Sequence, residues 1–509
     1  MGARSATRAD VRAAAERLGM RLDDEDIADY ADLISGALTE FYAPLDGLVV
    51  STPVNNYPRT PGYRPDPGSN PYQAWYVKTD IEGAASGPLK GKTVAIKDAI
   101  AVAGVPMMNG ASSLEGFMPD EDATVVTRVL DAGGTVAGKA HCEYFCYSGS
   151  SHTNAVVTVL NPHNPEYTTG GSSSGCAALV AGGEVDMAIG GDQGGSIRAP
   201  ASFCGIVGMK PTWGLVPYTG SASMETTLDH LGPMTRTVAD NALLLDVLAG
   251  PDGLDPRQIY KPFDRPSSRL GEGAKGLKIG VVREGFGHPQ SEPDVDAAVK
   301  AAADVLRKAG AEVSEISIPM HRHGLSIWAP LAIEGVYEQM FKSNGVGHNW
   351  RGRYSQAFLE KQASWRQRIS LFPAGVKLAL LSGEHIREAY HGRYYAKAQN
   401  LSLDLRAAYD AALAEVDVLV MPTVPVRGVK LPDPRGGRRE QLTPGFMPIV
   451  NTTAFDVSGH PAISVPCAMI DGLPVGMMII GRWFDDAMVY RAAAAYEGLT
   501  DRDIYIPKK

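Results

Sequence analysis

One stretch of the chain, residues 168–211, limits the possible folds more than any other because it carries two clusters of glycine and serine. The first cluster reads GGSSSG from Gly170, and the second reads GGDQGGS from Gly190. Glycine loses more backbone freedom on folding than any other residue, so these clusters indicate backbone that bends sharply or approaches a ligand closely. The apolar segments at residues 177–181 and 187–189 are expected to be buried. Both clusters are therefore predicted to be binding loops anchored on rigid elements.

From Leu89 onward, short apolar runs alternate with longer segments of helical periodicity. This alternation predicts an α/β fold with a central mixed sheet covered by helices on both faces. Near the C-terminal end, residues 463–480 are predicted to form a hairpin turned at Asp471-Gly472. The strand-like runs are residues 93–96, 135–137, 183–189, 277–282 and 416–421, and the helical ones are residues 123–132 and 294–309.

Composition shifts divide the chain into three predicted parts. Residues 1–72 contain two amphipathic helical segments, the second ended by Pro44, followed by a proline-rich extended linker. The catalytic core is predicted to comprise residues 73–260 and 395–509. Glycine, proline and polar residues after position 250 mark a boundary, so residues 261–394 are predicted to form an inserted small α/β domain that contributes to the substrate pocket.

Charge and cysteine content exclude several classes of protein. The net charge is −9 and no basic block stands out, which argues against a nucleic-acid partner. No run approaches the roughly 18 apolar residues of a membrane span, and the first ten residues lack the apolar core of a signal peptide. The five cysteines form an odd number without a C-x-x-C pair, which fits a reducing compartment. We therefore expect a cytoplasmic protein that binds neither nucleic acid nor membranes.

Three residues complete a recognisable pattern around the Gly/Ser clusters. Lys97 ends the run VAIK, Ser172 follows a Gly-Gly pair, and Ser196 lies in the motif DQGGSIR. With these positions filled, the chain resembles the amidase signature family of serine hydrolases from about residue 89 to residue 485. The variant GGDQGGSIR, together with the segments GLVPYTG and GFGHP, is most similar to the bacterial members that work alongside nitrile hydratases.

The resemblance implies a Ser-Ser-Lys triad that cleaves a small-molecule amide through an acyl-serine intermediate. Ser196 would be the nucleophile, and Ser172 would pass its proton to Lys97 and later return one to the departing amine. A lysine accepts a proton only in its neutral form, which burial favours, and the apolar neighbours of Lys97 predict burial. The peptide bond of Ser172 is expected to be cis. No metal or organic cofactor is expected.

The second Gly cluster is predicted to supply the oxyanion hole through backbone N–H groups, because glycine permits tight curvature around a developing negative charge. The donors would be those of Gln193, Gly194, Gly195 and Ser196. Asp192 and Arg198 are expected to form a supporting ion pair, with Ser173 as a further supporting residue. The resemblance also implies an acyl pocket suited to aliphatic or arylalkyl primary amides. Its wall would include Tyr147, Leu228, Trp328 and Val450.

Other motif matches give alternatives that the residues alone leave open or make less favourable. The run GSSSG fits the G-x-S-x-G nucleophile elbow and would make Ser173 the nucleophile. The G-x-G-x-x-G match at residues 271–276 precedes a strand-like run instead of following one, which argues against a dinucleotide site. His321 and His323 are expected to be a solvated pair and not metal ligands.

Related activities and assembly states complete the expectations from the resemblance. Hydrolysis of carbamates, anilides or hydrazides is one alternative, and the glutaminase subunit of a tRNA-dependent amidotransferase is another. In similar amidases a helical N-terminal segment helps to form a dimer, so a homodimer is expected here.

Overall fold

The structure, a computed structural model, describes residues 2–345 and 347–508, and the chain divides after Val54 into two compact units. In the first unit, the helices α1 (Arg8–Leu18) and α2 (Asp24–Ala37) pack through a small apolar core. A π-helical turn and a 3-10 turn continue α2 as far as Gly47. Pro44 stands in the first turn of that 3-10 segment, so the prediction that it ends the helical segment is wrong.

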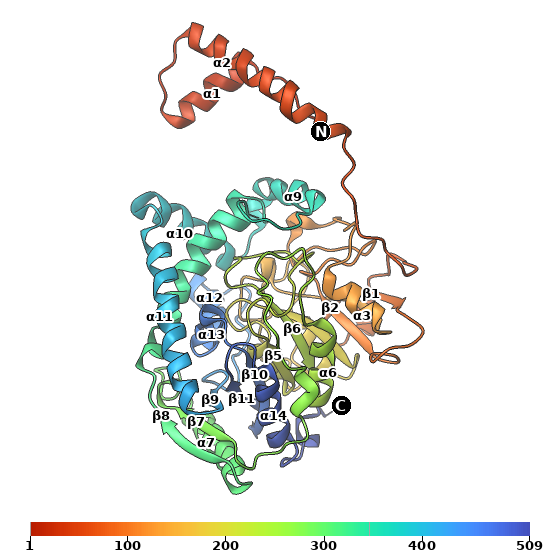
Figure 1. The fold of residues 1–509 in the computed structure, drawn as a ribbon, viewed down its shortest axis with the longest axis vertical. Helices are drawn as coiled ribbons and strands as arrows, with labels where there is room; N and C mark the ends of the chain where they lie inside the picture. Colours follow the sequence, from red (N-terminus) through yellow and green to blue (C-terminus); the bar gives the residue numbers. More distant parts are fainter. Residues whose placement is uncertain (1, 346, 509) are drawn as a thin grey trace. The chain divides into compact units, whose positions relative to one another are not determined.

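The second unit is built on one mixed sheet of 11 strands, in the order β1-β3-β2-β4-β6-β5-β10-β11-β9-β7-β8 (Figure 1). The neighbours of β2 and of β7 are parallel to them, and the other pairs are antiparallel. The strands are β1 (Trp75–Glu82), β2 (Thr93–Lys97), β3 (Thr135–Ala140), β4 (Met187–Asp192), β5 (Val207–Lys210), β6 (His230–Thr235), β7 (Lys278–Val282), β8 (Glu312–Ile316), β9 (Val418–Pro422), β10 (Ala462–Ile470) and β11 (Leu473–Ile480).

Helices cover both faces of this sheet, as the alternation of strands and helices predicts. The helices of the second unit are α3 (Thr124–Asp131), α4 (Ser174–Ala181), α5 (Arg198–Cys204), α6 (Val238–Leu248), α7 (Pro293–Lys308), α8 (Gly324–Pro330), α9 (Gln356–Gln362), α10 (Ala374–Tyr390), α11 (Arg393–Glu415), α12 (Arg438–Phe446), α13 (Thr453–Ser458) and α14 (Asp486–Glu497), and α3, α4, α5, α6, α7 and α14 contact its strands. Among the described residues, none of the helices is long and apolar enough to cross a membrane.

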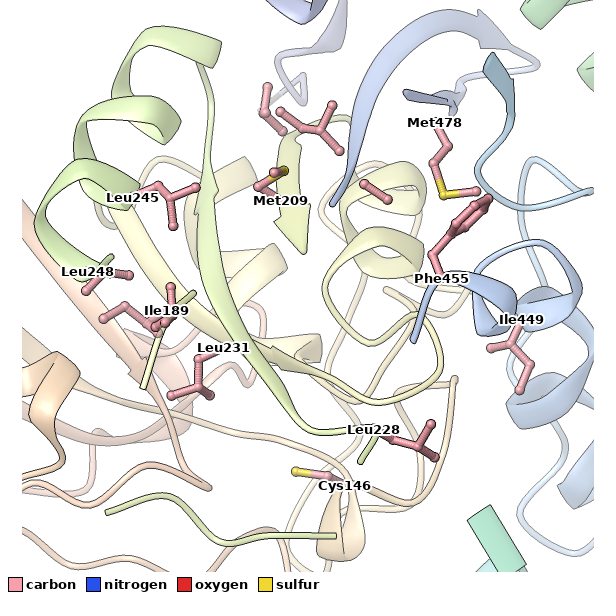
Figure 2. Close-up of a cluster of buried hydrophobic side chains, with 14 of the residues drawn as sticks. Cys146, Ile189, Met209, Leu228, Leu231, Leu245, Leu248, Ile449, Phe455 and Met478 are labelled. Atoms are coloured by element: carbon pink, nitrogen blue, oxygen red, sulfur yellow. The ribbon is translucent and has the colours of Figure 1, made fainter. Parts of the chain in front are cut away.

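Alternating side chains of β4 supply the cores on the two faces, because successive residues of a strand point to opposite sides. Ile189 belongs to the large apolar cluster that includes Leu245 and Leu248 of α6. Figure 2 shows these side chains together with Leu231 of β6. Ala188 instead joins the cluster formed with α4 on the other face. The central strands are therefore buried on both sides.

The hairpin and the boundaries of the predicted domains can be compared with the structure directly. β10 and β11 pair antiparallel across Asp471 and Gly472, which have φ values of 50° and 78°, so the predicted hairpin is confirmed. The segment 261–394 contributes β7 and β8 to the same sheet as the core and lies in the same compact unit. The boundaries of the inserted domain remain a prediction.

The pairing of β2 with β4 determines where the polar residues of the Gly/Ser stretch lie. The two strands are parallel, with Val94 opposite Met187 and Ile96 opposite Ile189. Carboxyl ends of parallel strands meet at one edge of a sheet. Lys97 at the end of β2 and the loop that follows β4 at Asp192 are therefore brought to the same edge.

Candidate active site

Lys97 and Ser172 form a buried hydrogen-bonded pair at this edge. The Lys97 Nζ donates to the Ser172 Oγ at 2.8 Å and to the Gly191 carbonyl at 3.1 Å. Both residues are at most 1% exposed. The Gly171–Ser172 peptide bond is cis, as the resemblance implies. The structure thus places the lysine amine in direct contact with the first of the two predicted catalytic serines.

Ser196 lies on the loop between β4 and α5, beside the segment that carries Ser172. The Ser196 carbonyl accepts a hydrogen bond from the Ser173 N–H at 3.2 Å. The Ser173 hydroxyl donates to the Gly191 carbonyl at 3.1 Å and accepts from the Gly191 N–H at 3.2 Å. Among the described residues, no hydrogen bond joins the hydroxyls of Ser172 and Ser196. The two segments are held together by their backbones and by Ser173.

The backbone of the Ser196 loop is folded around the carboxylate of Asp192. The Gly195 N–H donates to one carboxylate oxygen at 2.5 Å, and the Ile197 N–H donates to the other at 3.0 Å. The N–H of Gly195, one of the four predicted oxyanion donors, is thus bonded to Asp192 in this structure. The N–H groups of Gln193, Gly194 and Ser196 remain as the candidate donors.

Two side chains from distant parts of the chain fix the carbonyl groups of the same loop. The Trp328 indole donates to the Gln193 carbonyl at 2.6 Å, and the Thr452 hydroxyl donates to the Gly194 carbonyl at 2.6 Å. Gly195 has a φ of +131°, and a Cβ at that position would stand 2.3 Å from the Thr452 Oγ1. Glycine is therefore required at Gly195 both for its backbone conformation and for this close approach.

A buried network of charges lies behind the loop. The Arg198 guanidinium donates to both oxygens of Asp192 at 3.0 and 3.1 Å and to Asp456 of α13 at 2.7 Å, and all three side chains are buried. Burial opposes ionisation of Asp192, but the neighbouring Arg198 lowers the pKa of that carboxyl below its usual range. Burial and the Asp192 charge raise the pKa of Asp456 well above its usual value. The expected ion pair of Asp192 and Arg198 is thus part of a larger network.

Glu143 is a second buried carboxylate near the serines, and it was not among the predicted site residues. It accepts hydrogen bonds from the Ser174 hydroxyl at 2.9 Å and from the N–H and hydroxyl of Thr153 at 2.7 and 2.6 Å. Burial raises the pKa of Glu143 to about 7. The sequence contains a signal for this residue: Glu143 is the only acid in the stretch HCEYFCY. A single acid among mostly aromatic and cysteine side chains indicates a buried carboxylate.

The raised pKa of Glu143 predicts a pH dependence of stability. Below the usual pKa of 4.5 this carboxyl is protonated in both states, whereas between 4.5 and about 7 only the unfolded chain loses the proton. Rising pH over this window should therefore lower the free energy of unfolding, by about 3 kcal/mol at 1.36 kcal/mol per pKa unit. Glu143→Gln removes the effect, so the Tm of this variant relative to the wild type should rise from pH 5 to pH 8. A Tm difference that stays constant across this range contradicts the prediction.

A narrow cavity opens beside Ser196. Tyr147 and Trp328, two of the residues predicted for the wall of the acyl pocket, line this cavity. Leu228 is not among the described lining residues and is packed in the core on the loop before β6 (Figure 2). Val450 does not line the cavity either, and its neighbour Ile449 does. The full lining is Cys146, Tyr147, Ser148, Gly149, Gln193, Gly194, Ser196, Met224, Trp328, Gly445, Phe446 and Ile449.

The remaining motif matches have structural roles. His321 is 1% exposed and contacts the Tyr409 hydroxyl at 2.6 Å and the Asn451 Oδ1 at 3.1 Å, so the expectation that it is solvated is wrong. His323 is exposed. The G-x-G-x-x-G match at residues 271–276 lies directly before β7 and opens no helix.

Comparison with known proteins shows the family of the chain. The Amidase family model matches residues 70–490. The chain is 46% identical to an enantioselective amidase of Rhodococcus rhodochrous over 480 residues, which cover 92% of this chain and 91% of that relative. Two solved structures are similar along most of their length. One is a glutamyl-tRNA(Gln) amidotransferase subunit from Thermotoga maritima, with 31% identity and a TM-score of 0.70, covering 84% of this chain and 88% of that chain.

The second solved structure is native peptide amidase from Stenotrophomonas maltophilia, with 30% identity and a TM-score of 0.66. The similarity covers 81% of this chain and 83% of that chain. The chain therefore belongs to the amidase signature family and is a hydrolase that acts on amide C–N bonds.

Proposed function

We propose that the protein is a free-standing amidase that hydrolyses primary carboxamides, aliphatic or arylalkyl, to carboxylate and ammonia. The observation that carries the proposal is the buried hydrogen bond of 2.8 Å between the Lys97 Nζ and the Ser172 Oγ, beside the loop that carries Ser196. A serine hydroxyl is a weak nucleophile until a neighbouring base removes its proton. This pair supplies such a base through a second hydroxyl.

The proposed reaction passes one proton along Ser196, Ser172 and Lys97. The Ser196 Oγ attacks the amide carbon while its proton moves to Ser172, and the Ser172 proton moves to the amine of Lys97. When the C–N bond breaks, Ser172 protonates the leaving nitrogen and recovers a proton from Lys97, which releases ammonia. Water then cleaves the acyl-Ser196 ester by the same relay. The N–H groups of Gln193, Gly194 and Ser196 stabilise the oxyanion, and one such donor typically contributes about 3 kcal/mol.

The lining of the cavity supports a small uncharged acyl group. Aromatic and aliphatic side chains, including those of Trp328, Phe446 and Ile449, form much of its wall, and no charged side chain is among the described residues that line it. Glutamine would bring an ammonium and a carboxylate into this cavity without charged partners, which is unfavourable. The cavity therefore favours simple amides over the glutaminase role of an amidotransferase subunit.

The proposal is tested by ammonia release from propionamide, benzamide, glutamine and a phenyl carbamate, measured for wild type beside Ser196→Ala. We expect turnover of propionamide and benzamide that is lost in the variant, with little release from glutamine. Preferential hydrolysis of glutamine points to the amidotransferase role, and preferential hydrolysis of the carbamate points to a carbamate hydrolase. The absence of ammonia release from all four substrates contradicts a free-standing amidase of small carboxamides.

Phe446 is expected to limit the size of the acyl group. Its ring packs edge-on against Tyr147 with 6.2 Å between ring centroids, and both residues line the cavity. Phe446→Ala should raise the ratio of kcat/KM for 4-phenylbutyramide to that for propionamide by about tenfold, because a few methylene groups of space change discrimination by that order. Phe446→Leu, which keeps most of the volume, is the matched control. An unchanged ratio in Phe446→Ala contradicts this role.

We also propose a cytoplasmic homodimer. All five cysteines are free thiols, four of them buried, which supports a reducing compartment. The first unit exposes large apolar side chains, among them Leu33 and Leu48 at 68% each and Phe41 at 61%, which supports burial against a second copy. Light scattering that gives the mass of a monomer at micromolar concentration contradicts the dimer.

A further inference from the structure

The position of the Ser172 hydroxyl depends on the residues that flank it in the chain. On one side, the Gly171 N–H donates to the Gly149 carbonyl at 2.9 Å. On the other, the Ser173 N–H donates to the Ser196 carbonyl at 3.2 Å. The hydroxyl itself accepts only the Lys97 hydrogen bond among the described contacts. Other residues that hold the backbone around Ser172 therefore also determine the geometry of the proton relay.

Glu143 holds the same turn at two further points. Its backbone N–H donates to the Ser172 carbonyl at 3.2 Å, and its carboxylate accepts the Ser174 hydroxyl at 2.9 Å. One contact is at Ser172 and the other is two residues later, at Ser174. A single residue thus clamps the turn through its backbone and through its side chain.

The other carboxylate oxygen of Glu143, Oε2, binds the neighbouring loop at Thr153. It accepts from the Thr153 N–H at 2.7 Å and from the Thr153 hydroxyl at 2.6 Å. The Glu143 side chain packs tightly against Gly171. A Cβ added at Gly171 would stand 2.1 Å from the Ser150 carbonyl oxygen and 2.9 Å from the Glu143 Cγ. A shift of the Glu143 side chain would therefore be transmitted to the turn that carries Ser172.

We propose that Glu143, acting with Ser174, is a positioning residue that holds the Ser172 hydroxyl within hydrogen-bond reach of Lys97. The inference rests on the proposed Ser-Ser-Lys relay. Glu143 does not touch the reacting atoms. It acts because a displacement of about 1 Å in a catalytic group slows a reaction by about 100-fold, even when the substrate still binds.

The test compares Glu143→Ala, Glu143→Gln and Ser174→Ala with the wild type. The readouts are kcat and KM for benzamide, the rate of labelling of Ser196 by a fluorophosphonate, and Tm. Glu143→Ala should lower kcat and the labelling rate by about 100-fold and leave KM within about threefold. Ser174→Ala should lower both rates by about tenfold. Glu143→Gln should recover most of the rate, because its amide still accepts from Thr153 and still meets the Ser174 hydroxyl.

Asp486 provides a matched control for stability alone. Its buried carboxylate accepts hydrogen bonds from the N–H and hydroxyl of Thr212 at 3.0 and 2.6 Å, as Glu143 does from Thr153. Asp486→Ala should therefore lower Tm while kcat stays within about threefold of wild type. This control separates a loss of stability from a loss of positioning.

The outcomes separate the positioning role from the proposed function. The inference is overturned if folded Glu143→Ala or Ser174→Ala protein keeps the wild-type kcat and labelling rate. It is also overturned if kcat and the labelling rate fall as much in Glu143→Gln as in Glu143→Ala. If Glu143→Ala does not fold, kcat and the labelling rate of Ser174→Ala test the positioning role in its place. If the wild type hydrolyses none of the amides but Ser196 is labelled, the proposed substrate class fails and the labelling rates still test the positioning.

Discussion

Replacing Lys97 with alanine is expected to abolish amide hydrolysis while the protein stays folded. Lys97 forms a buried hydrogen bond of 2.8 Å with Ser172, and its removal leaves the proposed relay without the base that accepts the proton. Loss of a member of a catalytic triad lowers kcat by about 10³-fold or more. The measurement is kcat for benzamide, with circular dichroism and Tm as the check on folding.

Lys97→Arg is the matched variant that separates a base from a fixed positive charge. The guanidinium of arginine keeps its proton, so it can donate to Ser172 but cannot accept the proton of the relay. We expect Lys97→Arg to be as inactive as Lys97→Ala. Near-normal activity in either variant removes Lys97 from the role of base.

The second large effect is expected for Asp192→Asn. The neutral amide no longer balances the buried Arg198 charge, and its N–H₂ group cannot replace every bond that the Asp192 carboxylate accepts from Gly195, Ile197 and Arg198. Breaking a buried ion pair typically destabilises a protein by about 3 to 5 kcal/mol. A displaced oxyanion loop should also lower kcat by about 10² to 10³-fold. Tm and kcat measured on the same preparation test both effects.

Asp456→Asn is the control for this prediction because Asp456, like Asp192, accepts a hydrogen bond from the Arg198 guanidinium. Burial already raises the pKa of Asp456, and Asp192 still balances Arg198 in this variant. We expect a smaller loss of Tm and a kcat within about tenfold of wild type. Equal losses in the two variants contradict a special role for Asp192 in holding the loop.

The parts of the fold that the sequence predicted are those with a strong local signal. Short continuous apolar runs predicted β2 and β4, and the turn Asp471-Gly472 predicted the hairpin, because turn geometry and strand burial depend mainly on nearby residues. The motif positions Lys97, Ser172 and Ser196 come together because β2 and β4 are parallel neighbours, which the chain order of an α/β fold favours.

The parts that the sequence did not predict depend on contacts between residues far apart in the chain. Asp456 meets Arg198 across 258 positions, and no local pattern indicates that pairing. The occupied Gly195 N–H follows from how the loop closes on Asp192, which a run of glycines does not specify. Which neighbour lines a cavity depends on the exact path of the backbone, so Ile449 lines it and Val450 does not.

His321 shows the same limit for a polar residue. An H-x-H pair in a polar segment is usually solvated, yet His321 is buried between Tyr409 and Asn451, because its hydrogen bonds to both compensate the loss of water. The partners lie 88 and 130 positions away in the chain. Burial of a single polar side chain is thus decided by tertiary partners and not by its sequence neighbours.

The assignment of Ser196 as the nucleophile is tested most directly by reaction with a fluorophosphonate, followed by peptide mass spectrometry. The account predicts a single adduct on the peptide that contains Ser196, no adduct in Ser196→Ala, and a much slower reaction in Lys97→Ala. An adduct on Ser173, the nucleophile that the G-x-S-x-G alternative requires, would contradict the Ser196, Ser172 and Lys97 relay.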